Sequence, residues 1–459
     1  MLPGNLPAAG MTIDSVRDPG SDQGRQRLAT SGSIWVGSLE LDEAGEITGL
    51  NGPARTDQRM ARVLVRVHGA PVGFVTVSAA PAGTLTTRAR EAAATALADS
   101  LQCHSERHDL ANGRGHGTDW AASVACPRLF PAHGDLGMTV VICSRDRPDV
   151  LRDCLRSVQQ ARYPALEILV VDNAPADDRT RELVDELARD DPRVRYTCEP
   201  RPGLSRARNY GLKQARYDLV AFTDDDTIVD PGWPAALAAG FASDPGAVCV
   251  TGFVAAGNLD TGSERYFDSR YWWARVGEPR QYDLTSHRPP SRLYPFAAGM
   301  LGTGANFAVR RRSVTAIGGF DPLLGAGAPG RGGEDLDMFV RLILAGGRIC
   351  YLPAAFVWHR HRSNPQALGE QAYSYGHGLG AYLAKHLSNP ELRAGLAGHG
   401  LAHFGRLLGR VRRAVRDSKL GPSGGRVALT EAYGVLVGLL SYPRAVRRAD
   451  EHEDAPASV

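Results

Sequence analysis

The sequence predicts an α/β protein whose largest unit is a parallel β-sheet covered by helices. From residue 138 onward, short apolar runs alternate with helical segments, which is typical of right-handed βαβ units. Carboxylate and amide side chains follow several of these runs directly, at the sheet edge where such folds bind ligands. Before residue 138 the pattern differs, because apolar and polar residues alternate as in half-buried strands. We therefore expect a small α+β unit in front of a larger α/β unit.

Composition limits the class of protein. A chain of 459 residues is long enough for two or three domains, and 43% hydrophobic with 22% charged residues is ordinary for a globular protein. A net charge of +3 does not indicate a nucleic-acid-binding protein. The seven cysteines include no CxxC pair, and no apolar run reaches transmembrane length. With no signal-peptide pattern at the N-terminus, we expect a cytoplasmic location.

The N-terminal third divides into a tail and an accessory unit. Residues 1–30 are polar and predict a disordered tail, whereas residues 31–130 predict a small α+β accessory domain with its linker. Its expected elements are strands beginning at Ile34, Ala61 and Val72 and a helix over 84–101. Residues 103–137 have the composition of a linker. His104 and His108 have helical spacing, which suits either a metal site or stray histidines in a linker, and we favour the linker.

The expected elements of the α/β unit follow one another closely. The predicted strands are 139–143, 166–171, about 194–198, 219–222, 248–254, 349–352 and 354–358; the predicted helices are 148–160, 178–189, one beginning near 203 and one running on from 336. Segment 255–295 is expected to be irregular. It carries Trp272 and Trp273, which suit either a stack on an acceptor sugar or an ordinary core position.

Three adjacent carboxylates, Asp224, Asp225 and Asp226, follow the buried apolar run 219–222. Neighbouring carboxylates repel one another, and a hard divalent cation relieves this repulsion. Magnesium and manganese are held by carboxylates together with the oxygens of a substrate phosphate. The alternative is a solvated acidic turn. The position after a buried strand favours the metal site.

Further motifs stand at intervals around this triplet. In chain order they are Ser144-Arg145, Val-Val-Asp-Asn at 170–173, Gly203-x-Ser-x-Ala-Arg-Asn-x-Gly, the triplet, Gly304-Ala-Asn, Glu334-Asp335 and His359. In this order and spacing the chain resembles a family 2 glycosyltransferase over residues 138–362. The resemblance implies a GT-A fold, the Rossmann-like fold of nucleotide-diphospho-sugar transferases, and an enzyme of the hexosyltransferase type.

The resemblance implies a divalent metal, manganese or magnesium, bound with the diphosphate of the donor. Asp226 would contact the metal, Asp224 would face the metal or the ribose, and Asp225 would support them. His359 matches a histidine that serves some family members as a further ligand, and imidazole suits manganese better than magnesium. His361 lies on the same side of an extended chain, so the sequence leaves the choice between the two histidines open. A structural role for the histidine is the alternative.

The resemblance also implies a set of donor contacts. They are Ser144 and Arg145 after the first strand, Asp172 and Asn173 for the base, Arg208 and Asn209 for the diphosphate or base, Asp224 and Asp225 in the triplet, and Gly304, Ala305 and Asn306 on the donor-sugar and acceptor side. The alternatives are an Asx turn at residues 172–173 and a surface salt bridge at Arg208.

Glu334 and Asp335 are the catalytic candidates, and Asp335 matches the general base of the family. For transfer with inversion, a carboxylate must take the proton of the attacking acceptor hydroxyl. A helix that begins here would favour the ionised form of the carboxylate. The alternative is an N-cap carboxylate, and both roles are compatible because two acidic residues are present.

The C-terminal extension, residues 363–459, is predicted to be helical and basic. Its apolar positions are Leu407, Leu408, Val411, Val415, Val435, Leu436, Leu439 and Leu440. Two interpretations stay open. The segment either lies on the anionic inner face of the plasma membrane as a peripheral contact, or packs against the catalytic unit with its basic residues outward.

The predicted function is therefore metal-dependent, inverting transfer of a sugar, most simply from a UDP-sugar, to a hydroxyl acceptor. The acceptor class stays open between a glycan, a lipid-linked intermediate and a small natural product. A sugar nucleotidyltransferase is one rival, but it would need a Gly-rich phosphate loop after the first strand, where 144–148 contains no glycine. An inactive sugar-nucleotide-binding scaffold is the other rival, although every expected acidic residue is present.

Overall fold

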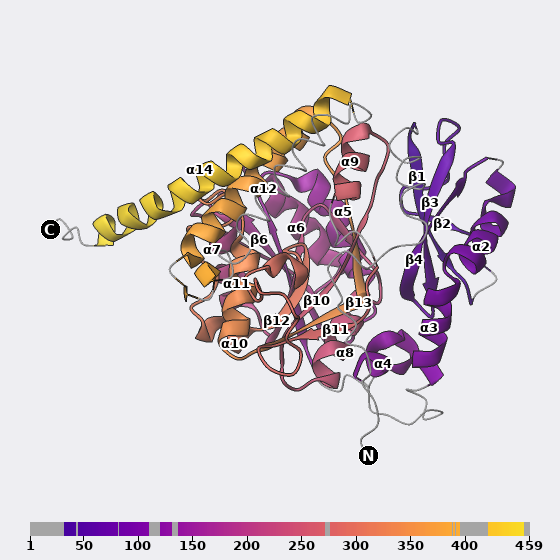
Figure 1. Ribbon diagram of the computed structural model, residues 1–459, viewed down its shortest axis with the longest axis horizontal. Coiled ribbons are helices and arrows are strands. Elements are labelled where there is room, and N and C mark those ends of the chain that lie inside the picture. The colour runs from indigo at the N-terminus through magenta and orange to yellow at the C-terminus, as the bar shows by residue number, and fades with distance from the viewer. Residues whose placement is uncertain are drawn as a thin grey trace, which may run out of the picture.

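The computed structural model describes residues 32–42, 45–80, 82–109, 120–130, 136–270, 276–387, 389–390, 392–394 and 421–453. Two β-sheets organise these residues, a nine-stranded sheet at the centre and a four-stranded sheet at one side (Figure 1). The predicted disordered tail, residues 1–30, lies outside the described residues.

The central sheet has the strand order β11-β13-β10-β12-β8-β5-β6-β7, with β9 paired to β13. Its strands are β5 (Met138–Ser144), β6 (Leu166–Asn173), β7 (Val194–Glu199), β8 (Leu219–Asp224), β9 (Thr227–Val229), β10 (Ala247–Ala256), β11 (Arg280–Tyr282), β12 (Asn306–Arg310) and β13 (Arg348–His359). Strands β5, β6, β7 and β8 are parallel, whereas β12 runs antiparallel between β8 and β10. The predicted parallel α/β sheet is confirmed, and the antiparallel strands β9, β11 and β12 make it mixed.

Helices cover both faces of the central sheet. Within the described residues the helices are α2 (Leu85–Ala96), α3 (Ala98–Asp109), α4 (Trp120–Ala125), α5 (Pro148–Gln159), α6 (Arg179–Asp190), α7 (Leu204–Gln214), α8 (Trp233–Ser243), α9 (Gly262–Arg270), α10 (Arg311–Ala316), α11 (Glu334–Leu344), α12 (Pro365–His386) and α14 (Gly421–Glu453), with single 3-10 turns at Ala82–Thr84, Pro127–Leu129 and Ala298–Met300. Val140 and Ile142 of β5 pack under α5, α6 and α8, and Val141 between them packs under α7 and α11. The strands read as continuous apolar runs because both of their faces are buried.

The accessory sheet has the order β2-β1-β3-β4, formed by β1 (Ile34–Glu40), β2 (Thr48–Gly49), β3 (Met60–Val67) and β4 (Ala70–Ser78). Helix α2 covers one face through Leu85, Ala89 and Ala93. On the other face, a shared cluster that includes Ile34 and Phe356 joins this sheet to β10 and β13 (Figure 1). The accessory sheet is thus anchored on the central sheet.

Three expectations about local structure were wrong. Helix α3 extends through the start of the predicted linker 103–137, and α4 lies within it. The predicted irregular segment 255–295 contains α9 and β11, and the two strands predicted over 349–358 form the single strand β13, whose pairing with β10 is interrupted by a bulge. Trp272 and Trp273 lie outside the described residues.

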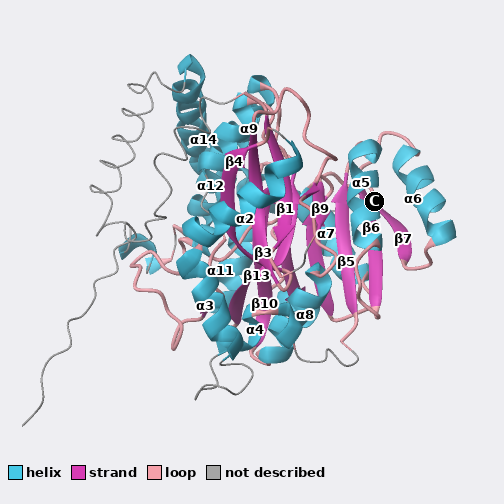
Figure 2. Cartoon of the chain, turned by 90° about the vertical axis from the view of Figure 1, so that its right-hand side faces the viewer, coloured by secondary structure: helices cyan, strands magenta, loops and turns pink. Residues whose placement is uncertain are grey.

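The C-terminal helix α14 lies along α12 (Figures 1 and 2). Glycines allow the close approach, because a Cβ added at Gly376 or Gly438 would come within 2.0 Å of a backbone carbonyl of the opposite helix. The apolar positions predicted between 407 and 415 lie outside the described residues. Among the described helices, none is both long and apolar enough to cross a membrane.

Candidate active site

The candidate site begins at the carboxyl ends of three neighbouring parallel strands. Ser144 at the end of β5 pairs in register with Asp172 of β6, and Cys143 pairs with Asp224 of β8. The predicted residues of three separate motifs therefore meet at one edge of the sheet, as the position of ligands in such sheets requires.

A long-range strand pairing brings the histidine to the acidic triplet. Strand β9 runs antiparallel to β13 and pairs Thr227 with His359, so the turn after Asp224 carries Asp226 to the end of β13. Ligand atoms of Asp224, Asp226 and His359 all lie within 4.8 Å of one another, and His359 Nε2 is 3.2 Å from Asp226 Oδ1. Two carboxylates and an imidazole form a donor set that fits a divalent cation such as manganese.

His359 and Asp226 form a buried ion pair. Burial alone would lower the pKa of His359, but the adjacent Asp226 raises it above the ordinary histidine value. Burial alone would raise the pKa of Asp226, yet His359 and Arg147 lower it well below its usual range. His361 packs instead on Phe267, with ring centroids 4.6 Å apart. The geometry therefore favours His359 over His361 as the metal ligand.

Asp225 points away from this group and is held by the loop after β5. Ser144 Oγ donates to Asp225 Oδ2 at 2.7 Å, and Arg147 pairs with both Asp225 and Asp226, reaching Asp226 Oδ2 at 3.1 Å. Arg145 is half exposed, with Asp146 3.6 Å away. Arg147 was not among the residues predicted for the site, although it follows Arg145 in the same loop, and that position was a signal for it.

Arg208 on α7 connects the triplet to the catalytic pair. It is 2% exposed, which excludes the surface salt bridge considered as an alternative. Its Nη1 donates to Glu334 Oε1 at 2.9 Å, and its Nη2 donates to the Gly304 carbonyl at 2.9 Å and lies 3.4 Å from Asp224 Oδ1. The guanidinium is thus held by two carboxylates and a carbonyl of the protein itself.

Glu334 and Asp335 begin helix α11, after Gly333 in a left-handed conformation with φ of 79°. Burial and the charge of Asp335 raise the pKa of Glu334 to about 7, against the opposing charge of Arg208. Asp335 Oδ1 accepts from the backbone N–H of Leu336 at 2.9 Å. A Cβ added at Gly304 would lie 3.0 Å from Asp335 Oδ2 and 3.1 Å from Arg208 Nη2, so Asp335 faces the same small space as Arg208.

Asp172 at the end of β6 is fully buried, with its Oδ2 accepting from the Tyr196 hydroxyl at 3.1 Å. Its Oδ1 has no hydrogen-bond partner among the described residues. Burial raises the pKa of Asp172 to about 6, although the bond from Tyr196 opposes this. A buried carboxylate oxygen without a partner is costly unless a ligand supplies a donor.

The amide side chains predicted to contact the donor are occupied within the protein. Asn306 is fully buried, accepts from Trp233 Nε1 at 2.7 Å and donates to the carbonyls of Phe253 and Ala355 at 2.8 Å. The prediction that Asn306 contacts the donor is therefore corrected to a structural role, because its hydrogen-bonding capacity is used and no surface is left.

Asn173 and Asn209 also bind backbone groups. Asn173 accepts from Gly203 N at 2.9 Å and donates to the Arg201 carbonyl at 2.8 Å, which fixes the loop before α7. Asn209 both donates to the Phe320 carbonyl and accepts from its N–H at 2.8 Å. Ala305 is half-buried, and its carbonyl accepts from Thr223 Oγ1 at 3.0 Å. The arrangement gives the two asparagines positioning roles, and their contact with the donor stays a prediction.

Comparison with known proteins agrees with this geometry. The family described as "Glycosyl transferase family 2" matches residues 139–301. The succinoglycan biosynthesis protein ExoM of Rhizobium meliloti (strain 1021) is 30% identical over 263 residues, 55% of this chain and 76% of that protein. The pre-mycofactocin glycosyltransferase of Mycobacterium tuberculosis is 28% identical over 249 residues, 53% of this chain and 46% of that protein.

Shorter and more distant matches are of the same kind. Poly-beta-1,6-N-acetyl-D-glucosamine synthase of Staphylococcus aureus is 32% identical over 116 residues, 25% of this chain and 28% of that protein. The solved structure of the mannosyltransferase PcManGT from Pyrobaculum calidifontis, in complex with GDP-Man and Mn2+, is 16% identical with a TM-score of 0.40, and the match covers 77% of this chain and 87% of that one. The match to most of ExoM and the family match together establish that this chain belongs to the family 2 glycosyltransferases and is an enzyme of the glycosyltransferase type with a GT-A fold.

Proposed function

We propose that this enzyme transfers a sugar from a nucleotide-diphosphate donor to a hydroxyl acceptor, with inversion at the anomeric carbon and with Asp335 as the general base. One observation carries the proposal. Asp224, Asp226 and His359 form one cluster, and Arg208 connects that cluster to Glu334, the neighbour of Asp335. A metal-binding group and a base on one continuous network are what such a transfer requires.

Asp224, Asp226 and His359 would hold the divalent cation, and the imidazole favours manganese over magnesium. When bound with the donor diphosphate, the cation would neutralise charge on the leaving group. Arg147 and Arg362 contribute positive charge beside Asp226, with Arg362 Nη2 3.9 Å from Asp226 Oδ2. These guanidinium groups suit the binding of phosphate oxygens at the same edge.

Asp335 would take the proton of the acceptor hydroxyl. The acceptor oxygen forms its new bond to the anomeric carbon, and the bond from that carbon to the diphosphate oxygen breaks with its electron pair leaving on the phosphate. Asp335 lies in the first turn of α11, where the helix N-terminus favours a carboxylate. Glu334 would not act as the base, because its carboxylate is engaged by Arg208. The same hydrogen bond would hold the start of α11 in place.

Asp172 would recognise the base of the donor. Its unpartnered Oδ1 is an acceptor, and the imide N–H of uracil is a matching donor, so we propose a UDP-sugar. The loop that follows β5, with Ser144 and Arg145, borders the same edge of the sheet. The backbone of Gly304 and Ala305 would line the sugar side, because Gly304 lies between Arg208 and Asp335.

A peripheral membrane contact through α14 would bring a lipid-linked acceptor to the enzyme. Leu429, Tyr433, Leu436 and Leu440 are 51% to 63% exposed and stand at helical spacing along one face of α14. Arg426, Arg444 and Arg447 on the same helix add positive charge suited to an anionic lipid surface. A glycan acceptor is the general expectation for the family, and a small natural product is the remaining class.

A donor panel tests the proposal. The purified enzyme is incubated with UDP-, GDP- and dTDP-sugars, each with manganese, magnesium or a chelator, and release of the nucleoside diphosphate is measured. We expect release from a UDP-sugar with manganese and its loss with the chelator. Release only from GDP-sugars would overturn uracil as the base that Asp172 recognises, and undiminished release in the chelator would overturn the metal dependence. With an acceptor in hand, NMR of the product linkage tests inversion.

A further inference from the structure

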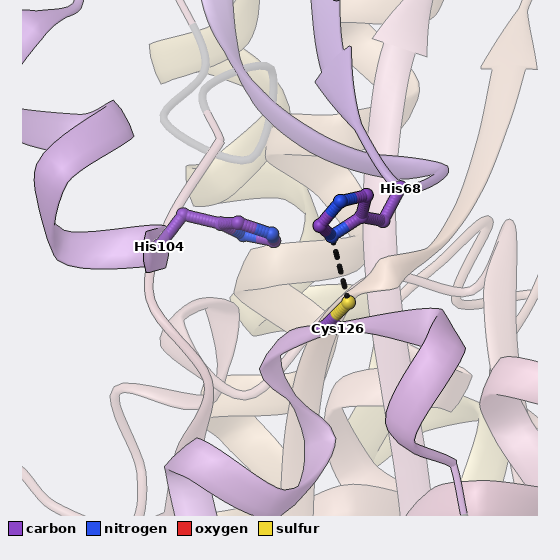
Figure 3. Close-up of side chains that lie close together, drawn as sticks. All are labelled: His68, His104 and Cys126. Atoms are coloured by element: carbon purple, nitrogen blue, oxygen red, sulfur yellow. Dashed lines mark hydrogen bonds between the residues drawn. The ribbon is translucent and has the colours of Figure 1, made fainter. Parts of the chain in front are cut away.

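A second group of metal-binding side chains lies in the accessory unit, away from the candidate active site. His68 lies in the turn between β3 and β4, His104 lies on α3, and Cys126 follows α4 (Figure 3). One ligand atom from each lies within 4.8 Å of the others, and His68 Nδ1 is 3.2 Å from Cys126 Sγ. Three elements that are distant in sequence thus direct nitrogen and sulfur atoms toward one point (Figure 3).

The burial of these groups is not explained by hydrogen bonding alone. His104 is 8% exposed and Cys126 is fully buried, and His104 Nε2 has no hydrogen-bond partner among the described residues. His108, one turn along α3, has an unpartnered buried Nδ1 of its own, and its ring lies 5.0 Å from that of His68. Buried polar nitrogens without partners are rare, and a bound ion is one recognised explanation.

The surroundings of His68 match those of a metal-ligating histidine. While its Nδ1 faces Cys126, its Nε2 lies 3.7 Å from Asp42 Oδ2, and Arg128 donates to the same Asp42 oxygen at 2.6 Å. Ligating histidines commonly direct the second ring nitrogen toward a carboxylate, which fixes the orientation of the ring. His68 also has φ of 55°, a left-handed conformation that is uncommon for a residue other than glycine.

We propose that His68, His104 and Cys126 bind a structural zinc ion, with His108 or a water molecule as the fourth ligand. A thiolate with imidazoles is a donor set for zinc, unlike the carboxylate-rich set of the candidate active site. With Zn–N and Zn–S bonds of about 2.0 and 2.3 Å, tetrahedral ligand atoms stand roughly 3.3–3.7 Å apart, close to the observed N···S separation. The ion would join the turn of the accessory sheet to α3 and the end of α4.

Cobalt substitution tests the proposal, because a thiolate bound to cobalt gives a charge-transfer absorption that carboxylates and imidazoles cannot give. The full chain, without a polyhistidine tag, is stripped with chelator and titrated with Co2+, and zinc is then added in competition. We expect the thiolate band in the wild-type protein, its displacement by zinc, and its loss in Cys126→Ser. Cys103→Ser is the matched control, since Cys103 precedes His104 on α3 but lies outside the cluster, and it should keep the band.

Further variants keep the test decisive if Cys126→Ser does not fold. His104→Gln leaves the thiol in place and should weaken cobalt binding at least tenfold, whereas Asp42→Asn should weaken it roughly 10- to 100-fold by loosening His68. Elemental analysis of protein purified without chelator should find zinc that is retained in Asp226→Asn. The absence of a thiolate band from the folded wild-type protein, or its persistence in Cys126→Ser, would overturn the proposal.

Discussion

Arg208 donates to Glu334 Oε1 at 2.9 Å across 126 residues of sequence, inside the protein. The second nitrogen of the same guanidinium lies 3.4 Å from Asp224 Oδ1. A displacement of Asp224 would therefore shift the first turn of α11 through Arg208, and the proposed base lies in that turn. Through Arg208, helix α7 positions the acidic triplet and the start of α11 relative to each other.

Replacement of the proposed base should abolish transfer while leaving the fold intact. We expect Asp335→Asn to lower kcat roughly 100- to 10,000-fold, the range for loss of a general base, with donor binding little changed. Initial rates with the donor identified in the panel, and donor affinity by calorimetry, measure both effects. Asp185→Asn on α6 is the control, because Asp185 is exposed and 3.9 Å from its partner Arg181. Full activity of Asp335→Asn would move the base assignment elsewhere.

A methyl group at Gly304 should disturb the alignment of Arg208 and Asp335. The added Cβ would lie 3.0 Å from Asp335 Oδ2 and 3.1 Å from Arg208 Nη2, so one of the two side chains must move. We expect Gly304→Ala to reduce kcat by up to roughly 100-fold, as a misplacement of about 1 Å can do. Gly369→Ala is the matched control, since nothing lies within 4 Å of its added Cβ. Equal rates for the two variants would contradict the close approach.

Substitutions of His359, the last residue of β13, and of His361, which follows the strand, should affect Mn2+ binding differently. We expect His359→Gln to weaken Mn2+ binding by at least roughly 10- to 100-fold, because it removes a direct ligand and outer-shell changes alone reach this range. His361→Gln should weaken Mn2+ binding less than His359→Gln does, because His361 reaches the site only through its Nδ1, 3.2 Å from His359 Nδ1. Calorimetric titration of chelator-treated protein measures both constants. The reverse order of effects would assign the site to His361.

Donor affinity should depend on pH through Asp172, whose pKa is raised to about 6. Above this pH the carboxylate is ionised and accepts an N–H from the base in a charge-assisted bond, and below it the neutral acid is a weaker acceptor. We expect UDP affinity to fall by up to about tenfold per pH unit below about 6. In the protein without a bound nucleotide, the effect of pH on the free energy of unfolding has the opposite sign. This free energy falls as pH rises through about 6, because ionising a buried carboxyl with a raised pKa destabilises the fold. Titrations from pH 5 to 8 check this, and Asp172→Asn should bind weakly with a flat profile.

The contact between α12 and α14 should depend on its glycines. A Cβ at Gly438 would lie 2.0 Å from the His377 carbonyl, so the helices must separate. We expect Gly438→Ala to lower the free energy of unfolding by about 1–3 kcal/mol, as overpacking does. On an open helix surface the same change stabilises by about 1 kcal/mol, which is the expectation for the control Gly369→Ala. Chemical denaturation of both variants measures the difference, and a stabilised Gly438→Ala would refute the packing.

The sequence by itself determined the parts of this protein that depend on local pattern. Apolar runs buried on both faces identified strands β5, β6 and β8, and the polar residues at their ends identified Asp172 and Asp224 as edge residues. The order and spacing of the motifs were sufficient to identify the family. Each motif is short and becomes specific only together with the motifs before and after it.

Tertiary structure alone decided which side chains meet. The pairing of β9 with β13 places His359, and not His361, against Asp226. The burial of Arg208 and the saturated bonds of Asn306 follow from packing between elements that are distant in sequence. The group of His68, His104 and Cys126 was invisible as a unit because its members stand on three separate elements. Short-range pattern encodes strands and their ends, whereas contacts across the sheet depend on long-range pairing and burial, which no local spacing records.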